Sequence, residues 1–226
     1  MLGIYGIVIV FMLISWAVTS RLKSKFKEYS EVSFRGNLSG AEVAAKMLRD
    51  NGITDVQVIS VEGQLTDHYN PLEKTVNLSP EVYMGRSVSA AAVAAHECGH
   101  AVQHANAYVW LGLRSNLVPA VSFASKWMQW ILLAGILTIQ VFPYLLIAGI
   151  VLFAFTTLFS FITLPVEFDA SRRGLAWLES SGITTSDEHV MAKDALWWAA
   201  MTYVVAALSS LATLLYYVSL LMGRRR

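Results

Sequence analysis

The chain has 226 residues, 55% of them hydrophobic, with a mean hydropathy of +0.51 and only 15% charged residues. This composition is too apolar for a typical soluble domain, and the chain is too long for a single membrane anchor. The formal net charge of +1, without a basic patch interleaved with aromatic residues, excludes a nucleic-acid-binding protein, and a single cysteine, Cys98, excludes an intramolecular disulfide. We therefore expect a mainly α integral membrane protein.

Four segments are long and apolar enough to cross a bilayer, whose hydrocarbon core of about 30 Å takes roughly 20 helical residues. They are Leu2–Val18, Phe123–Val141, Tyr144–Leu164 and Leu196–Met222. We predict an N-terminal membrane anchor over residues 1–20, a transmembrane hairpin over residues 121–165 and a C-terminal membrane segment over residues 195–226. A cleaved signal peptide is the alternative at the N-terminus, but "RLKSKFK" follows the first apolar run and no Lys or Arg precedes it, which favours an uncleaved anchor.

Lysine and arginine beside the apolar segments predict the orientation, because they are enriched in short cytoplasmic loops. If the N-terminus lies outside, the basic residues that flank the first three segments all fall on one side: Arg21, Lys23, Lys25, Lys27, Lys126, Arg172 and Arg173. We therefore expect a multi-pass protein of the cell membrane whose residues 21–120 are cytoplasmic. Four full spans would place residues 224–226, all arginine, outside; either the last segment does not cross fully or these arginines are tolerated there.

The polar stretch between the first two apolar segments predicts a small α+β region. Ser39–Ile53 has a serine at the N-cap position, apolar residues at helical spacing and Gly52 near its end, which predicts a short amphipathic helix. Val56–Val61 and Lys74–Ser79 suit short strands, and Asp67–Pro71, "DHYNP", is expected to form a turn between them.

A small-residue helix follows, with Ser87 or Ser89 available as its N-cap, and it contains the sequence "HECGH". Residues four apart lie on one face of a helix, so His96 and His100 can bind one ion. Glu97 lies beside them, where a carboxylate can take a proton from a metal-bound water. Zn²⁺ suits this donor set and lowers the pKa of bound water. The alternative is a pair of ordinary core histidines, which leaves three of five histidines within nine residues unexplained.

A catalytic zinc needs a third protein ligand and an open position. His104 lies on the same helix face, but eight residues span about 12 Å, too far from His96 to share an ion. We expect His104 at the surface or supporting a ligand.

In the segment 166–194, directly after the hairpin, Glu167 and Asp169 are the acidic candidates for the third ligand, and Pro165 is expected to begin a new helix there. We favour Glu167 as ligand, with Asp169 orienting a histidine; the alternative is a charged flank paired with the following arginines.

A hydrolytic site also needs a donor for the developing oxyanion. His68, Tyr69 and His189 are candidates, although each also suits a turn or surface position. Cys98 is expected to point away from the metal face as a buried thiol.

The stretch "NLSPEVYMGRSVSAAAVAAHECGHAVQHA", with "DHYNP" upstream, resembles the YugP-type neutral zinc metallopeptidases, and the likeness covers most of the chain. The layout is also similar to the HtpX-like and CAAX prenyl protease group, in which a membrane hairpin separates the H-E-x-x-H helix from a ligating glutamate. The resemblance implies zinc ligands at His96, His100 and Glu167 and a general base at Glu97. Those relatives carry Asp four residues after the ligating Glu, where this chain has Ser171.

Together these features predict a membrane-embedded zinc metallopeptidase that hydrolyses protein or peptide substrates in membrane protein turnover or quality control, in contact with membrane lipid and without a nucleic-acid partner. One alternative is a non-catalytic membrane scaffold or adaptor with a closed structural zinc site. A small transporter is a third possibility, but the charged residues cluster outside the apolar segments.

Overall fold

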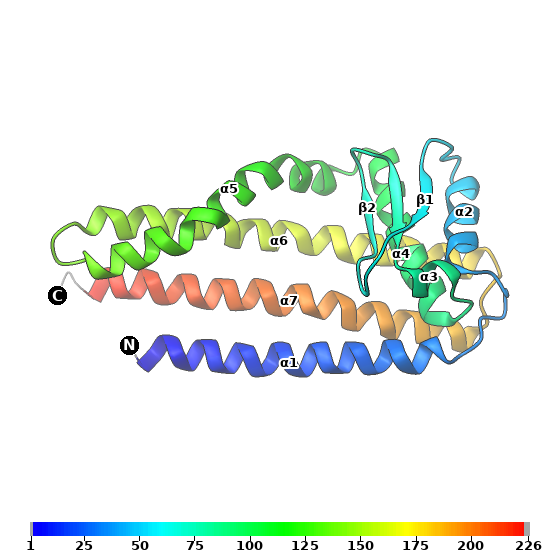
Figure 1. Ribbon diagram of the computed structural model, residues 1–226, viewed down its shortest axis with the longest axis horizontal. Coiled ribbons are helices and arrows are strands. Elements are labelled where there is room, and N and C mark those ends of the chain that lie inside the picture. The colour runs from blue at the N-terminus through cyan, green and yellow to red at the C-terminus, as the bar shows by residue number, and fades with distance from the viewer. Residues whose placement is uncertain (1, 224–226) are drawn as a thin grey trace. The chain divides into compact units, whose positions relative to one another are not determined.

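The computed structural model describes residues 2–223 and is mostly helical, with one small sheet (Figure 1). Residues 224–226 are the three arginines whose side of the membrane the sequence left open, and they lie outside the described residues. The elements are α1 (Leu2–Ser30), α2 (Gly40–Asp50), β1 (Gln57–Ser60), β2 (His68–Asn70), β3 (Thr75–Leu78), α3 (Pro80–Met84), α4 (Val88–Ala105), α5 (Val109–Leu137), α6 (Pro143–Ser180) and α7 (Ser186–Gly223).

Four of these helices, α1, α5, α6 and α7, are long and apolar enough to cross a membrane, which confirms the number of candidate spans expected from the sequence. Helices α1, α6 and α7 each contain one of the predicted apolar segments and extend beyond it, whereas α5 ends at Leu137, four residues before the predicted end at Val141. The helix predicted to begin at Pro165 is not separate, because Pro165 lies inside α6. A proline there removes one backbone hydrogen bond. The helix nevertheless continues, since Val166, Ala170 and Leu178 beyond it are fully buried.

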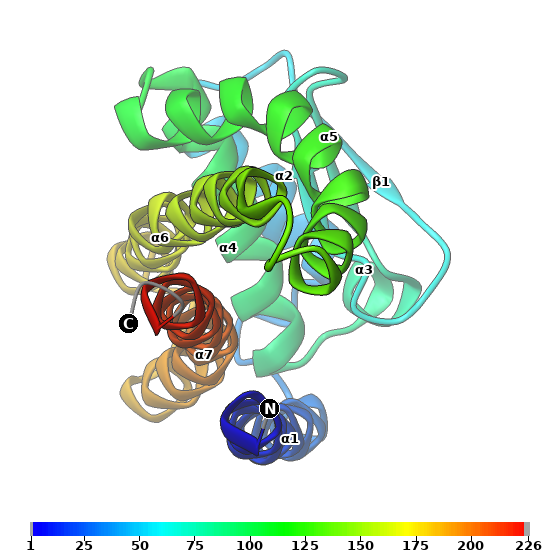
Figure 2. The same cartoon turned by 90° about the vertical axis from the view of Figure 1, so that its left-hand side faces the viewer.

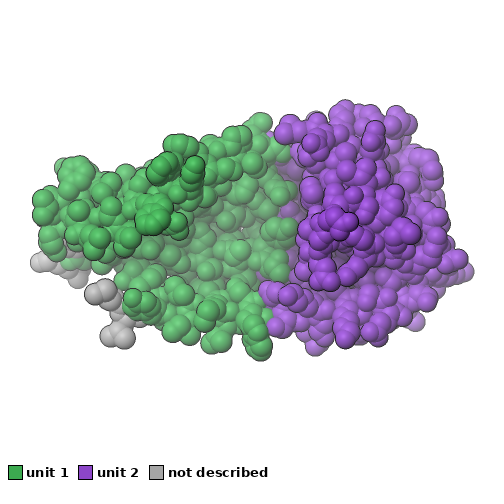
Figure 3. All heavy atoms as spheres, viewed as in Figure 1, with its two compact units in different colours: residues 1–17, 113–164, 202–226 green, residues 18–112, 165–201 purple. Residues whose placement is uncertain are grey.

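The chain divides into two compact units (Figure 3). Unit 1 contains residues 1–17, 113–164 and 202–226, and it is helical wherever the structure describes it apart from the short turn between α5 and α6. Its core is formed by Leu132, Leu146 and Ile150, with side chains of α7 packed against them. Gly135 allows close packing here, because a β-carbon at that position would lie 2.6 Å from the Leu146 backbone.

Unit 2 contains residues 18–112 and 165–201 and holds the sheet and "HECGH". Its amphipathic helix α2 confirms the sequence prediction: the Ser39 hydroxyl accepts from the Glu42 N–H, and the Glu42 carboxylate accepts from the Ser39 N–H. Its apolar face is buried and packs against α4. The residues on that face are Val43, Ala44, Met47 and Leu48.

The sheet has strand order β1-β3-β2, with β1 parallel and β2 antiparallel to β3. The two predicted strands are confirmed as β1 and β3, but the turn predicted at Asp67–Pro71 is wrong, because His68–Asn70 forms β2. Turn-forming residues do not decide the conformation here. Tyr69 pairs with Val76 across the ladder and packs against the core, so tertiary contacts override the local preference.

Helix α4 lies between α6 and the sheet (Figure 2). Ser87 is its N-cap and accepts a hydrogen bond from the Ala90 N–H, as the sequence predicted. Almost every residue of α4 up to Gln103 is buried. Its alanines bring neighbouring backbones close, and this packing holds the "HECGH" residues in fixed positions.

Candidate metal centre

His96 and His100 project from consecutive turns of α4, with ring centroids 4.9 Å apart and ring planes 82° to each other. Cys98 points elsewhere, because its thiol is fully buried and lies 3.6 Å from the Ala44 carbonyl oxygen on α2. The two histidines and Cys98 therefore lie on different faces of α4, and the face with Cys98 packs against α2. Both histidines are held within unit 2 and are mostly shielded from solvent.

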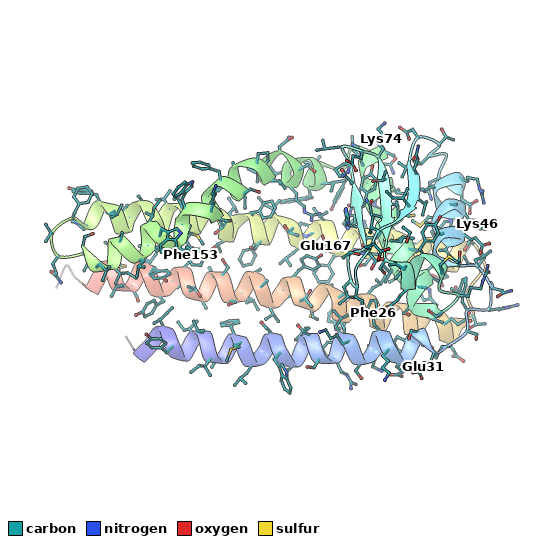
Figure 4. All side chains as sticks on the ribbon, in the orientation of Figure 1. Phe26, Glu31, Lys46, Lys74, Phe153 and Glu167 are labelled. Atoms are coloured by element: carbon teal, nitrogen blue, oxygen red, sulfur yellow. The ribbon has the colours of Figure 1, made fainter. Side chains whose placement is uncertain are left out.

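Glu167, on α6, faces both histidines (Figure 4 labels its position). One carboxylate oxygen, Oε2, lies 3.4 Å from His96 Nε2 and 3.7 Å from His100 Nε2. The side chain is buried, with only 2% of the residue exposed. A buried carboxylate that approaches two imidazoles at once is costly without a cation or protons to compensate its charge.

These donor atoms fit a zinc ion. Ligands held about 2.0–2.1 Å from a tetrahedral ion lie roughly 3.3 Å from each other, close to the two distances that Glu167 makes. Glu97 is a second acidic candidate, since donor atoms of His96, Glu97 and His100 all lie within 4.8 Å of one another. Glu167 is the better third donor, because a single oxygen is near both Nε2 atoms.

Two glycines allow α4 and α6 to come this close. A β-carbon at Gly174 would lie 2.8 Å from the backbone of Ala95, and one at Gly99 would collide with the carbonyl oxygen of Ala170. Each helix therefore presents a glycine to the backbone of the other. This mutual approach places Glu167 opposite His96 and His100.

The Nδ1 atoms of both histidines are hydrogen-bonded, which orients the rings. Gln103 is fully buried, and its Nε2 donates to the Val166 carbonyl oxygen at 2.8 Å and to Asp169 at 2.9 Å. Its side-chain oxygen must then face His100 Nδ1, 3.1 Å away, so Nδ1 carries the proton and Nε2 keeps its lone pair. Ser171 Oγ lies 3.0 Å from His96 Nδ1 and can accept from it in the same way.

Asp169 reaches His100 only through Gln103, and it also accepts hydrogen bonds from Arg172 and Arg173. The sequence suggested two roles for Asp169, to support a histidine or to pair with the arginines. In the structure Asp169 makes both kinds of contact, within one hydrogen-bond network. The arginines neutralise a carboxylate that is only 5% exposed.

Glu97 is also buried, and burial raises the pKa of its carboxyl to about 7, although the neighbouring His96 acts in the opposite direction. The backbone N–H of Tyr69 on β2 stabilises its charged form. A carboxyl with a pKa near neutrality can both accept and release a proton at physiological pH. This is the property required of a general base beside a hydrolytic metal.

The other site candidates from the sequence, His68, Tyr69, His104 and His189, each have their own surroundings in the structure. The Tyr69 hydroxyl is 2.7 Å from His104 Nδ1, so these two residues join β2 to the end of α4. His68 is exposed, with Nδ1 2.7 Å from the Thr66 carbonyl oxygen. His189 lies in the first turn of α7, where Nδ1 is buried and has no hydrogen-bond partner among the described residues.

Sequence reasoning missed the roles of Gln103 and Ser171. Gln103 follows His100 by three residues and Ser171 follows Glu167 by four, so each lies on the same helix face as a metal-binding candidate. That spacing is the signal from which both could have been found.

An H-E-x-x-H pair opposite a buried glutamate, in a chain with four helices of membrane-spanning length, is the pattern typical of membrane zinc metallopeptidases. The chain belongs to the family described as "Putative neutral zinc metallopeptidase", whose model matches residues 4–222. It is 43% identical over 205 residues to the "Putative membrane protease YugP" of Bacillus subtilis (strain 168), an alignment that covers 91% of this chain and 90% of that protein. No solved structure gives a significant match.

Proposed function

We propose that the protein is a zinc-dependent endopeptidase of the cell membrane, with its active site on the cytoplasmic side. The observation that carries the proposal is the position of Glu167 Oε2 within 3.7 Å of both histidine Nε2 atoms. The membership of a zinc metallopeptidase family and the similarity to a membrane protease support it. The cytoplasmic side follows from the basic residues that flank the first three apolar segments.

His96, His100 and Glu167 would hold the zinc ion. Bound zinc acts as a Lewis acid and lowers the pKa of water in its open position to about 7. Glu97 would accept the proton of the attacking water and then pass it to the leaving amine, so its carboxyl ends the cycle in its starting state. Gln103 and Ser171 keep the two Nε2 atoms directed at the metal position.

The burial around Glu97 supports this role for it. Glu97 is 8% exposed, and a carboxylate oxygen of it lies within 4.8 Å of a ring nitrogen of each histidine, which is close enough for a proton transfer from water beside the ion. Protein or peptide chains are the proposed substrates, and turnover or quality control of membrane proteins is the proposed setting.

Cleavage of unfolded casein by the detergent-purified, zinc-loaded protein tests the proposal. The wild type should cut casein and lose activity when a chelator removes the metal. Glu97→Gln should bind zinc as the wild type does but cleave at least about 100-fold more slowly, because it cannot take the proton. An active Glu97→Gln protein would contradict this mechanism. Two inactive proteins that bind zinc through four protein ligands would instead favour a structural metal.

A further inference from the structure

Unit 2 has a groove of about 450 Å³ between α2 and β1. Its lining is mostly apolar, and its residues come from α2, from the loop before β1, from β1 itself and from α3. They include Ala41, Ala45, Leu48, Val56, Val58 and Tyr83. In Figure 1, α2 lies beside β1, on the side of the sheet away from β2. The groove is therefore at the opposite edge of the sheet from the strand that contacts Glu97 and His104.

The edge of β1 beside this groove has free backbone groups. β1 is an edge strand, parallel to β3, and the Gln57 N–H donates to the Lys74 carbonyl oxygen at 3.0 Å while the Val61 N–H donates to that of Leu78 at 2.8 Å. Backbone groups alternate in direction along a strand. Those of Val58 and Ser60 therefore point away from β3, and no hydrogen bond joins them to another described residue.

The groove can hold side chains from one face of a strand added at this edge. Val58 is in register with the buried Val76, so its side chain points to the same face of the sheet, toward α2. Ala41 and Ala45 are one helical turn apart on the facing side of α2, and their small side chains leave the space open. An added strand would place every second side chain between β1 and α2, and apolar side chains would fit there.

Arg49 supplies a positive charge at one end of the groove. It is exposed and forms no ion pair with the residues described, whereas the nearby charges are paired: Lys46 with Asp50 at 2.7 Å, and Lys74 with Asp55. Only residues 51–56 separate α2 from β1, so Arg49 is near the beginning of β1. A strand antiparallel to β1 would end there, with its C-terminus beside the guanidinium.

We propose that this groove binds the extended, apolar C-terminal tail of a protein substrate as an additional strand antiparallel to β1, with the tail carboxylate on Arg49. Backbone hydrogen bonds to Val58 and Ser60 would supply part of the affinity, and the apolar groove would select the side chains. The role as a substrate docking site depends on the proposed peptidase function, whereas the peptide-binding surface itself does not.

Fluorescence anisotropy tests the binding surface. The probe is an N-terminally labelled eight-residue peptide of alternating threonine and valine with a free carboxylate, and the protein is full-length, detergent-solubilised, chelator-treated Glu97→Gln, which cannot cleave it. We expect saturable binding with a Kd of roughly 10–100 μM. Amidation of the peptide terminus, or Arg49→Glu, should weaken binding at least about tenfold. Lys27→Glu is the matched control, an exposed charge reversal on α1 that should leave binding unchanged.

Ala45→Trp provides a second variant, which should block the groove and weaken binding without a change in charge. No saturable binding up to about 1 mM would overturn the proposal, as would equal binding of the carboxylate and amide peptides. These measurements use metal-free protein, so their failure is distinct from a failure to cleave casein.

The docking role has its own test in the wild-type, zinc-loaded protein. Casein-derived fragments that carry the same tail should be cleaved with a KM at least about fivefold lower than tail-amidated fragments, and Arg49→Glu should remove this difference in KM. Equal KM values would overturn the docking role.

Discussion

The side-chain oxygen of Gln103 lies 3.1 Å from Nδ1 of His100, and the Gln103 amide nitrogen is committed to two other acceptors. The side-chain amide cannot flip by half a turn without losing both of those hydrogen bonds. Its oxygen therefore stays toward His100 and fixes the proton of that imidazole on Nδ1. A neutral imidazole with that tautomer presents an Nε2 lone pair to a metal. Gln103 is therefore a positioning residue for a candidate zinc ligand.

Replacement of Gln103 by leucine, which has a similar size but cannot hydrogen-bond, should weaken zinc binding by roughly 10–100-fold. The ring of His100 would lose the acceptor that orients it. Zinc affinity can be measured by competition with a chromophoric chelator. Gln64→Leu is the control, because Gln64 is an exposed glutamine whose amide donates to Glu81 and to no residue of the metal centre. Equal affinities in the two variants would show that Gln103 does not position the ligand.

The two buried acids on α6 should respond differently to removal. Glu167→Ala deletes a proposed ligand and should reduce zinc affinity by more than the roughly 10–100-fold typical of a supporting residue. Asp169→Ala should stay within that range, because Asp169 acts on His100 only through Gln103. Glu179→Ala, an exposed acid on the same helix, should have no effect on zinc affinity. A larger loss for Asp169→Ala than for Glu167→Ala would reverse the two assignments.

The features predicted correctly from the sequence are those determined by local spacing. The N-cap of α2 at Ser39 and that of α4 at Ser87 follow from short-range hydrogen bonds. The apolar segments follow from composition, and the shared face of His96 and His100 follows from helix geometry. These features need no knowledge of which elements pack together.

The features that the sequence did not predict depend on packing between distant segments. The strand at His68–Asn70 forms because it pairs with β3 and packs against α4, although its residues favour a turn. The continuation of α6 through Pro165 depends on buried contacts beyond the proline. Gln103 is a typical surface residue by type. Its complete burial is explained only by three partners brought together by α4 and α6.

Gly174 should be needed for the approach of α6 to α4. A β-carbon there would lie 2.8 Å from the Ala95 backbone, so Gly174→Ala must push the two helices apart. We expect a destabilisation of about 1–3 kcal/mol, with weaker zinc binding because Glu167 moves away from the histidines.

Gly112→Ala is the matched control, since Gly112 is a helical glycine in α5 whose added β-carbon would meet nothing within 4 Å. That variant should be neutral or slightly stabilising, because alanine favours helix. Thermal unfolding in detergent, followed with and without zinc, measures both effects. Equal melting temperatures and zinc affinities for the two variants would show that the close contact is not required.

The capping box of α2 should make the stability of unit 2 depend on pH. The Ser39 backbone N–H, which donates to Glu42 at 2.7 Å, lowers the pKa of the Glu42 carboxyl, and Arg86 acts in the same direction. The folded state thus holds the proton less tightly than the unfolded state, where the pKa is about 4.3. The stabilisation is fully present above that value and is lost as the pH falls through the lower pKa of the folded state.

Glu42→Gln removes this charge, so the wild type should be more stable than the variant at pH 7, and the difference should shrink as the pH falls below about 4.3. Melting temperatures of the two proteins between pH 7 and pH 3 measure the difference. Glu62→Gln, a change of the same kind at an exposed loop position, should leave the melting temperature at pH 7 unchanged. A difference between wild type and Glu42→Gln that stays constant across this range would mean that the carboxylate charge does not contribute to the cap.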